Sequence, residues 1–138
     1  MSSPIVHLSR KYTFSASHRL YTDHLSSQEN EFIFGKCANP NGHGHNYGLT
    51  VTVCGAVDDM TGYVIPINEL DETVRRHVLD EYDHRFLNMD VEDYLDLVPT
   101  GENIAKMIWQ RLFDPMDGLL AKVVVDETRN NSFEYTGR

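Results

Sequence analysis

The chain has 138 residues, which is close to the usual size of one domain, so we expect a single domain over residues 1–138. Hydrophobic residues make up 41% of it and charged residues 24%, which is ordinary for a globular protein with one core. A formal net charge of −9, together with the lack of a signal peptide and of a bilayer-spanning apolar stretch, predicts a cytoplasmic protein that binds neither nucleic acid nor membrane.

Residues 5–18 are predicted to form a strand, because apolar side chains recur at every second position. Successive side chains of a strand point to opposite faces, so one face of this strand would pack against the core. The side chains in the apolar phase are Val6, Leu8, Tyr12, Phe14, Ala16 and His18. A histidine therefore ends the face that the core covers.

Residues 21–42 are mostly polar and contain Ser, Asn, Gly and Pro, which predicts a long loop. A second strand is predicted from residue 43, where the alternation returns. His43 and His45 begin its apolar phase, which continues through Tyr47, Leu49, Val51 and Val53. Side chains two positions apart on a strand point the same way, so both imidazoles can reach a single metal ion.

Two helices are predicted between residues 68 and 115. The first begins with Asn68 as its N-cap and has one apolar stripe, formed by Leu70, Val74, Val78 and Tyr82. The second begins with Thr100 as its N-cap and ends before Pro115. Its stripe consists of Ile104, Ile108 and Leu112.

Two further strands are predicted at 119–127 and 132–135, separated by a turn. The order ββααββ indicates an α+β fold in which a four-stranded antiparallel sheet carries both helices on one face. Such a small sheet leaves its edges exposed, and pairing the edges between subunits would protect them. We therefore expect an oligomer whose subunits close a β-barrel.

Three histidines in apolar phases, His18, His43 and His45, could meet at the ends of the first two strands. A zinc ion bound by three imidazoles keeps an open position for water or substrate, which is typical of catalytic sites. Five residues separate Cys37 from His43. The thiol of Cys37 could transfer protons, or it could close a structural zinc site as the fourth ligand. Both cysteines are expected to be free thiols, with Cys54 in a structural position.

The pair Asp83–His84 follows the first predicted helix, where a histidine can simply interact with the helix dipole. The alternative is an acid–base pair in which the aspartate orients the imidazole. Adjacent residues can pair in this way only if the backbone turns between them.

Glu127 is in phase with Val123 and Val125, although a buried carboxylate is costly without a partner. A ligand with two N–H donors side by side, such as a guanine-like edge, would satisfy both carboxylate oxygens. The alternative is a glutamate at the strand end that reaches solvent. Thr100 and Glu102 are explained more simply by helix capping.

Several segments resemble the 6-pyruvoyl-tetrahydropterin synthase family, and the resemblance extends from about Tyr12 to Tyr135. The most specific segment is the loop FGKCANPNGHGHNY at 34–47. The shorter matching segments occur in the same order as in the family: FSASHRL at 14–20, DH at 83–84, TGEN at 100–103, ET at 127–128 and NN at 130–131.

The resemblance implies the tunnelling fold, in which trimers close a twelve-stranded barrel and two trimers stack as a homohexamer. It implies a zinc ion held by His18, His43 and His45. It also implies proton transfer by a cysteine and an Asp–His pair from different subunits, and a pocket for the pterin ring. The proton-transfer residues would be Cys37, Asp83 and His84, and the pterin pocket would contain Glu127, Thr100 and Glu102.

The implied reaction converts 7,8-dihydroneopterin triphosphate to 6-pyruvoyl-tetrahydropterin and triphosphate, a lyase step of tetrahydrobiopterin biosynthesis. The first alternative is 6-carboxy-tetrahydropterin synthase, whose cysteine lies closer to the first histidine of its motif. The second alternative is a non-catalytic, zinc-stabilised pterin-binding oligomer. One departure from the family is Pro66, which stands where an Asp or Asn is usual before the first helix. The residues that contact the triphosphate stay open, with Arg19, Lys36 and Arg85 as candidates.

Overall fold

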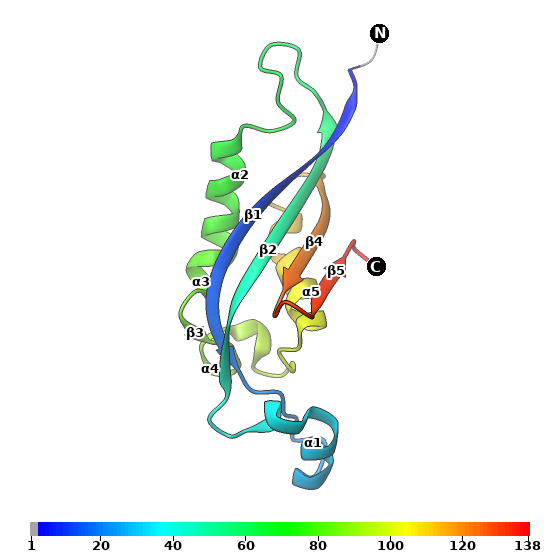
Figure 1. Cartoon of the computed structure of the whole chain (residues 1–138). Helices are drawn as coiled ribbons and strands as arrows, with labels where there is room; N and C mark the ends of the chain where they lie inside the picture. The colour runs from blue at the N-terminus through cyan, green and yellow to red at the C-terminus, as the bar shows by residue number, and fades with distance from the viewer. Residues whose placement is uncertain (1–2) are drawn as a thin grey trace.

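The computed structural model describes residues 3–138, so residues 1–2 of the expected domain lie outside the described part. Figure 1 shows two long strands running the length of the molecule, with the main helices packed behind them and α1 beyond their lower end. The strands are β1 (Ile5–His18), β2 (His43–Ala56), β3 (Arg85–Phe86), β4 (Leu120–Asp126) and β5 (Ser132–Tyr135). The α-helices are α1 (Ser27–Phe34), α2 (Ile67–Val74), α3 (Asp80–Tyr82), α4 (Leu87–Asp90) and α5 (Gly101–Phe113). The remaining turns are 3₁₀ at η1 (Gly35–Ala38) and η3 (Glu92–Tyr94), and π-helical at η2 (Arg75–Leu79).

The strands form one five-stranded sheet in the order β3-β1-β2-β4-β5. The β1–β2 ladder is antiparallel along its whole length, from the pair Ile5–Ala56 to the pair His18–His43. The prediction of a four-stranded sheet is therefore wrong, because a fifth strand, β3, pairs in parallel with β1 opposite Ala16 and Ser17. A strand of two residues is too short to produce an alternating pattern in the sequence.

One face of the sheet packs against both long helical segments. Alternate residues of β1, β2 and β4 join the apolar stripes of the helices in a single core, as the alternation predicted. The fully buried members of this core include Tyr47, Leu49, Val51, Val53, Leu70, Val74, Val78, Ile104, Ile108, Val123 and Val125.

The first long helical segment starts two residues earlier than expected. Pro66 is the N-cap and its carbonyl accepts hydrogen bonds from the N–H groups of Glu69 and Leu70, so the prediction of Asn68 as the cap is wrong. The φ angle of Pro66 is −57°, a value that the proline ring imposes and that suits the residue before a helix. The segment continues from α2 through η2 to α3 and ends at Tyr82.

The expected loop at 21–42 contains α1, so this prediction is also wrong. Ser26 and Glu29 form a reciprocal capping box, in which each side chain accepts the backbone N–H of the other residue. Gly35 ends the helix with φ 59° and opens the 3₁₀ turn that contains Cys37. The Ser-x-x-Glu signature was present in the sequence, but an apolar stripe was not.

The C-terminal elements agree more closely with the predictions. Thr100 caps α5 as expected, because its side chain accepts a hydrogen bond from the backbone N–H of Asn103. A register shift between Thr52 and Val53 brings Leu120 into the core, so β4 begins one residue late. The strand ends at Asp126, so Glu127 follows the strand instead of lying in it.

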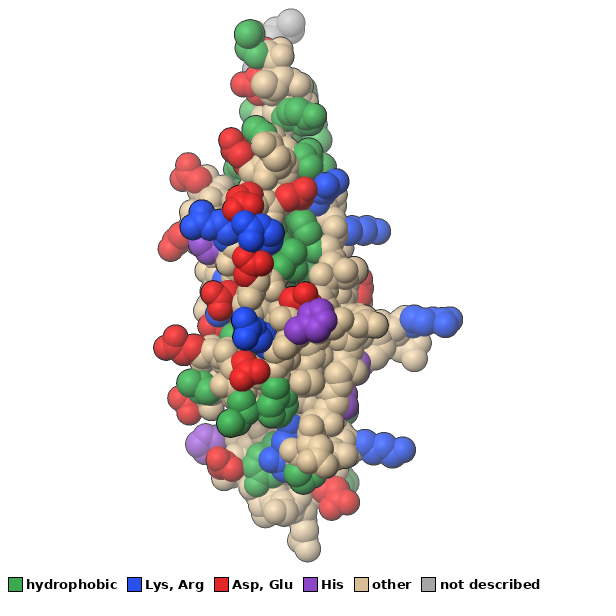
Figure 2. Space-filling model, turned by 90° about the vertical axis from the view of Figure 1, so that its left-hand side faces the viewer, with side chains coloured by type: hydrophobic (Ala, Val, Ile, Leu, Met, Phe, Trp, Pro, Cys, Tyr) green, Lys and Arg blue, Asp and Glu red, His purple; other side chains and the backbone are tan. Residues whose placement is uncertain are grey.

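In the described part of the chain, no helix has both the length and the apolar character needed to cross a membrane. Figure 2 shows acidic and basic side chains intermingled on the face that carries α2. Part of this mixing comes from Arg75, which pairs with Glu72 and Asp80.

Candidate metal centre

The structure brings His18, His43 and His45 together at one end of the β1–β2 ladder. His18 is the last residue of β1 and lies directly opposite His43, the first residue of β2. One ring nitrogen from each of the three residues lies within 4.8 Å of the others. The Nε2 atoms of His18 and His43 are 3.0 Å apart.

A backbone carbonyl fixes the tautomer of His18. The ring is fully buried and its Nδ1 lies 2.7 Å from the carbonyl oxygen of Pro99. A carbonyl can only accept, so Nδ1 carries the proton and Nε2 keeps a free lone pair directed at the other two histidines. The hydroxyl of Tyr47 lies 3.3 Å from the same Nδ1. No residue pattern points to the role of Pro99, because a backbone group makes this contact.

The surroundings of His18 and His43 favour the neutral forms of their imidazoles. Burial lowers the pKa of His18 to about 4. Burial, and then the proximity of His45, lower the pKa of His43 from its ordinary value. Neutral imidazole is the form that binds metal ions, so these two shifts favour the binding of a cation by His18 and His43.

The donor set fits a divalent metal ion. The Nε2 atom of His45 is buried without a hydrogen-bond partner, although buried polar atoms nearly always have one. Nitrogen atoms that share a tetrahedral zinc ion lie roughly 3.3 Å apart, which is close to the 3.0 Å between the Nε2 atoms of His18 and His43. Among residues 3–138, neither Cys37 nor a carboxylate joins the three histidines in this group. The arrangement therefore provides three ligands, and the remaining coordination positions of a bound ion would be open.

Glu127 lies beside the histidines. Its Oε2 atom is 3.9 Å from Nε2 of His18, and its side chain is only 13% exposed. Its backbone N–H donates to the carbonyl of Asn131, which fixes the turn after β4. The structure therefore does not place this carboxylate in solvent, which was one of the alternatives left open by the sequence.

Hydrogen bonds hold the turn that contains Cys37 against the residues that follow His18. The carbonyl of Cys37 accepts the N–H of Leu20 at 2.8 Å, and Nε of Arg19 donates to the carbonyl of Ala38 at 3.0 Å. The half-buried thiol is therefore carried by a segment that is tied to the end of β1.

Asp83 and His84 form a side-chain pair at the outer edge of β1. The backbone turns there, because His84 has φ 62°, and its Nδ1 lies 3.1 Å from Oδ1 of Asp83. The N–H of Ser15 donates to the same carboxylate oxygen and lowers the pKa of Asp83. The hollow beside His84 is also lined by Ser17 and Asn46, which are out of phase with the three histidines, and by His45 itself.

The N-terminus of α5 also lies next to the metal centre, because Pro99 directly precedes Thr100. The side chain of Thr100 is used to cap the helix, whereas Glu102 is exposed in the first turn. Both predicted residues therefore follow within three positions of Pro99, whose backbone carbonyl contacts His18.

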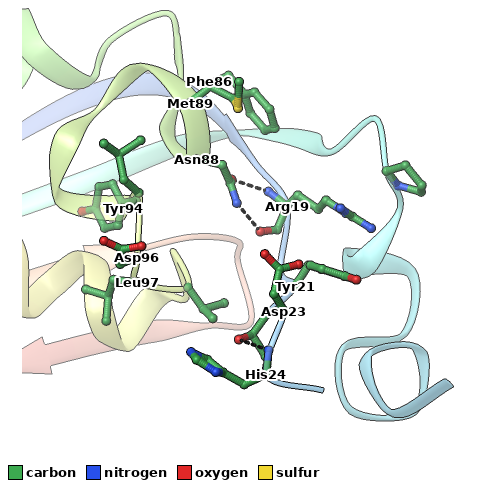
Figure 3. Close-up of a pocket in the computed structure, with 14 residues that line it drawn as sticks. Arg19, Tyr21, Asp23, His24, Phe86, Asn88, Met89, Tyr94, Asp96 and Leu97 are labelled. Atoms are coloured by element: carbon green, nitrogen blue, oxygen red, sulfur yellow. Dashed lines mark hydrogen bonds between the residues drawn. The ribbon is translucent and has the colours of Figure 1, made fainter. Parts of the chain in front are cut away.

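Asn88 is a residue at the site that sequence reasoning missed. Its side chain makes two hydrogen bonds of 2.8 Å to the backbone of Arg19, which follows His18 (Figure 3). The same residues line a hollow of about 380 Å³. The guanidinium of Arg19 lies 3.9 Å above the ring of Tyr21. No local motif marks an asparagine that bonds to a distant backbone, so the sequence offered no signal for this contact.

Comparisons with known proteins agree with this fold. A family model described as 6-pyruvoyl tetrahydropterin synthase matches residues 7–138. A Homo sapiens protein named 6-pyruvoyl tetrahydrobiopterin synthase is 47% identical over 131 residues, which cover 94% of this chain and 90% of that protein. A Dictyostelium discoideum protein of the same name is 44% identical over 137 residues and covers 99% of both chains.

Solved structures show the same relationship. The structure of Caenorhabditis elegans 6-pyruvoyl tetrahydropterin synthase is similar with a TM-score of 0.96 and 42% identity, covering 100% of this chain and 99% of that chain. The Plasmodium falciparum 6-pyruvoyl tetrahydropterin synthase, at 20% identity and a TM-score of 0.65, shares the fold. With a family match over nearly the whole length and relatives above 40% identity, the chain belongs to the 6-pyruvoyl tetrahydropterin synthase family.

Proposed function

We propose that this protein is a zinc-dependent carbon–oxygen lyase that converts 7,8-dihydroneopterin triphosphate to 6-pyruvoyl-tetrahydropterin and triphosphate, in the cytoplasmic synthesis of tetrahydrobiopterin. The observation that carries the proposal is the group of three histidine nitrogens, in which the Pro99 carbonyl leaves Nε2 of His18 free. The names of relatives at 43–47% identity agree with this activity.

His18, His43 and His45 would hold the zinc ion. When bound there, the ion supplies a Lewis acid for the hydroxyl oxygens of the substrate side chain. The buried carbonyl of Pro99 keeps the ring of His18 in one orientation, as partners of metal-binding histidines generally do.

Cys37 and the Asp83–His84 pair would move the protons. A thiolate at Cys37 would take a carbon-bound proton from the substrate side chain. His84 would exchange a second proton with the same substrate side chain. Asp83 accepts from the Ser15 backbone and stays ionised, so it can orient and charge-balance the His84 imidazole. Triphosphate leaves as the carbon–oxygen bond breaks, and both hydroxyl carbons become carbonyls by internal redox without an external reductant.

Glu127 would hold the pterin ring. Its carboxylate is largely shielded and lies beside His18, so it can accept two adjacent N–H donors of the ring while the side chain of the substrate reaches the metal centre. Thr100 and Glu102, at the start of α5, would contribute to the same pocket.

The complete site would need more than one chain. His84 is 82% exposed and lies at the edge of the sheet, where a neighbouring subunit could approach it. In the homohexamer that we propose, edges of the sheet pair between subunits in a closed barrel, and the Asp83–His84 pair of one subunit serves the Cys37 of another.

The experiment is an assay of the zinc-loaded protein with 7,8-dihydroneopterin triphosphate, comparing Cys37→Ala with Cys54→Ala. We expect the wild type to release triphosphate and form the diketo pterin. Cys37→Ala should keep zinc and oligomeric state while turnover falls by about 10²–10⁴-fold, and Cys54→Ala should remain active. Acetaldehyde with a carboxy pterin as products, or loss of zinc in Cys37→Ala, would contradict the proposal.

A further inference from the structure

A polar network lies in the core at the end of α3. The hydroxyl of Tyr82 donates to Oδ2 of Asp93 at 3.0 Å and lies 2.7 Å from the hydroxyl of Tyr94. A hydroxyl has one proton, so Tyr94 must donate to Tyr82. Arg111 of α5 donates to both oxygens of Asp93 at 2.6 and 3.2 Å, and to the carbonyl of His77 at 3.0 Å.

Stability alone is a weak explanation for this network. Tyr82 and Tyr94 are almost completely buried, and Asp93 and Arg111 are mostly shielded from water. Burial of such groups costs solvation free energy, and well-packed apolar side chains often replace buried ion pairs without loss of stability. A fully bonded network does, however, restrict the backbone around it to one arrangement.

The backbone restricted here leads directly to the Asp83–His84 pair. Tyr82 is the last residue of α3, and the carbonyl that Arg111 binds belongs to the π-helical turn just before α3. The network therefore holds both the last residue of the helical segment and the irregular turn that sets its direction.

His84 depends on this restraint because most of its side chain is in solvent, and Asp83, with which it pairs, belongs to the same segment. The side chain is 82% exposed, and the residue has a left-handed backbone at φ 62°. Its N–H donates to the carbonyl of Ser15, and on the other side of the pair Asn88 binds the backbone of Arg19 (Figure 3). The segment is thus fixed on both flanks, while the imidazole projects away from the chain.

We propose that Tyr82, Asp93 and Arg111 are positioning residues for His84 in the reaction. The network fixes the end of α3, and the end of α3 fixes the direction in which His84 presents its imidazole. This inference rests on the proposed function in so far as it uses the role of His84. Misplacement of a reacting group by about 1 Å can lower a rate a hundredfold, so a modest relaxation of the helix end would be measurable.

The chain contains a matched control. Tyr12 donates to Asp71 at 2.7 Å, and Arg10 donates to both oxygens of the same carboxylate. This is another tyrosine–aspartate–arginine arrangement on the same helical segment, but Asp71 lies eleven positions before Tyr82, roughly 16 Å along the helix. Tyr82→Phe and Tyr12→Phe each remove one phenolic hydroxyl from an aspartate.

The test compares these two variants with wild type and His84→Ala. Tyr82→Phe should lower kcat by on the order of tenfold, with KM within about twofold and zinc content unchanged, and Tyr12→Phe should match wild type. Deuterium uptake should rise in the peptide that contains residues 83–86 in Tyr82→Phe only. Equal kcat and equal uptake in the two phenylalanine variants would overturn the inference.

The design separates the two proposals. If His84→Ala turns over normally, the catalytic role of His84 fails, and the uptake measurement still decides whether the network holds the segment. If His84→Ala is slow but Tyr82→Phe is as active as Tyr12→Phe, only the positioning inference fails. Asp93→Asn, which keeps the size and one acceptor oxygen, replaces Tyr82→Phe if that variant does not fold, and Arg111→Lys should restore part of the kcat lost in Arg111→Ala.

Discussion

At the scale of single residues, the chemistry of the site depends on which nitrogen of His18 carries a proton. The carbonyl of Pro99 decides this, and the pairing of His18 with His43 across the ladder then directs two lone pairs at one point. The position of His45, two residues further on, follows from strand geometry alone. These contacts explain how three imidazoles can share a small buried volume.

The lowered pKa of His18 predicts a pH-dependent stability of the metal-free protein. The folded-state pKa is about 4, below the ordinary value of 6.5, so the unfolded chain takes up this proton first as the pH falls. The contribution of neutral His18 to the free energy of unfolding is complete above pH 6.5 and is lost by pH 4. It amounts to about 3 kcal/mol. Urea denaturation with a chelator present should show this decline in wild type and a weaker one in His18→Gln.

The exposed His24 provides the control for this measurement. His24→Gln should retain the wild-type decline between pH 6.5 and pH 4. An identical decline in His18→Gln would show that burial of His18 does not govern the acid stability.

At the scale of elements, the long strands were predictable because each presents one face to the core. Phe14, Ala16 and His18 recur with period two, and so do His43, His45 and Tyr47, so the meeting of the two strand ends could be inferred. The shorter elements could not be found in this way. Strand β3 has two residues, and α1 leaves Phe32 and Ile33 exposed, so neither shows a buried periodicity.

Contacts made by the backbone were also beyond sequence reasoning. Pro99 binds His18 through its carbonyl, and Asn88 binds the backbone of Arg19 from a distant segment. The N-cap of α2 at Pro66 was missed because Asn68 is a stronger cap by residue type. Local preference was overridden there by the φ angle that proline imposes.

Helix α1 is predicted to position the turn that contains Cys37 through Asn30. This buried side chain accepts the N–H of Thr22 and donates to the carbonyls of Thr22, Leu25 and Ser26. Asn30→Ala should destabilise the segment by about 2 kcal/mol, because buried backbone groups lose their partner. Limited proteolysis within residues 21–42 should accelerate, and turnover should fall.

Gln28→Ala, at an exposed position of the same helix, is the control and should resemble wild type in both measurements. Equal resistance of Asn30→Ala and Gln28→Ala to protease would contradict the role given to Asn30.

At the scale of the whole molecule, the sheet of one chain is open. On its outer side, β1 pairs with β3 only at Ala16 and Ser17, and β5 has four residues at the opposite edge. Unpaired edges of this kind are commonly covered by other strands, which supports the proposed barrel of several subunits. The exposed Asp83–His84 pair would then meet the Cys37 of a neighbouring chain.

Subunit mixing tests this arrangement directly. Cys37→Ala and His84→Ala chains should each be nearly inactive as pure oligomers. When they are co-assembled at random in equal amounts, about a quarter of the sites should contain an intact cysteine and an intact histidine from two chains, so activity should return to about that fraction. Co-assembled oligomers that stay inactive would show that one chain supplies both residues.

The proposed reaction depends on three imidazoles that hold zinc and leave room for oxygen atoms of the substrate. Zinc X-ray absorption spectroscopy of the purified oligomer measures these ligands. We expect three histidine nitrogens and one or two oxygens at about 2.0–2.2 Å, unchanged in Cys37→Ala. A sulfur atom at about 2.3 Å that disappears in Cys37→Ala, or a zinc ion enclosed by four protein ligands, would contradict this expectation.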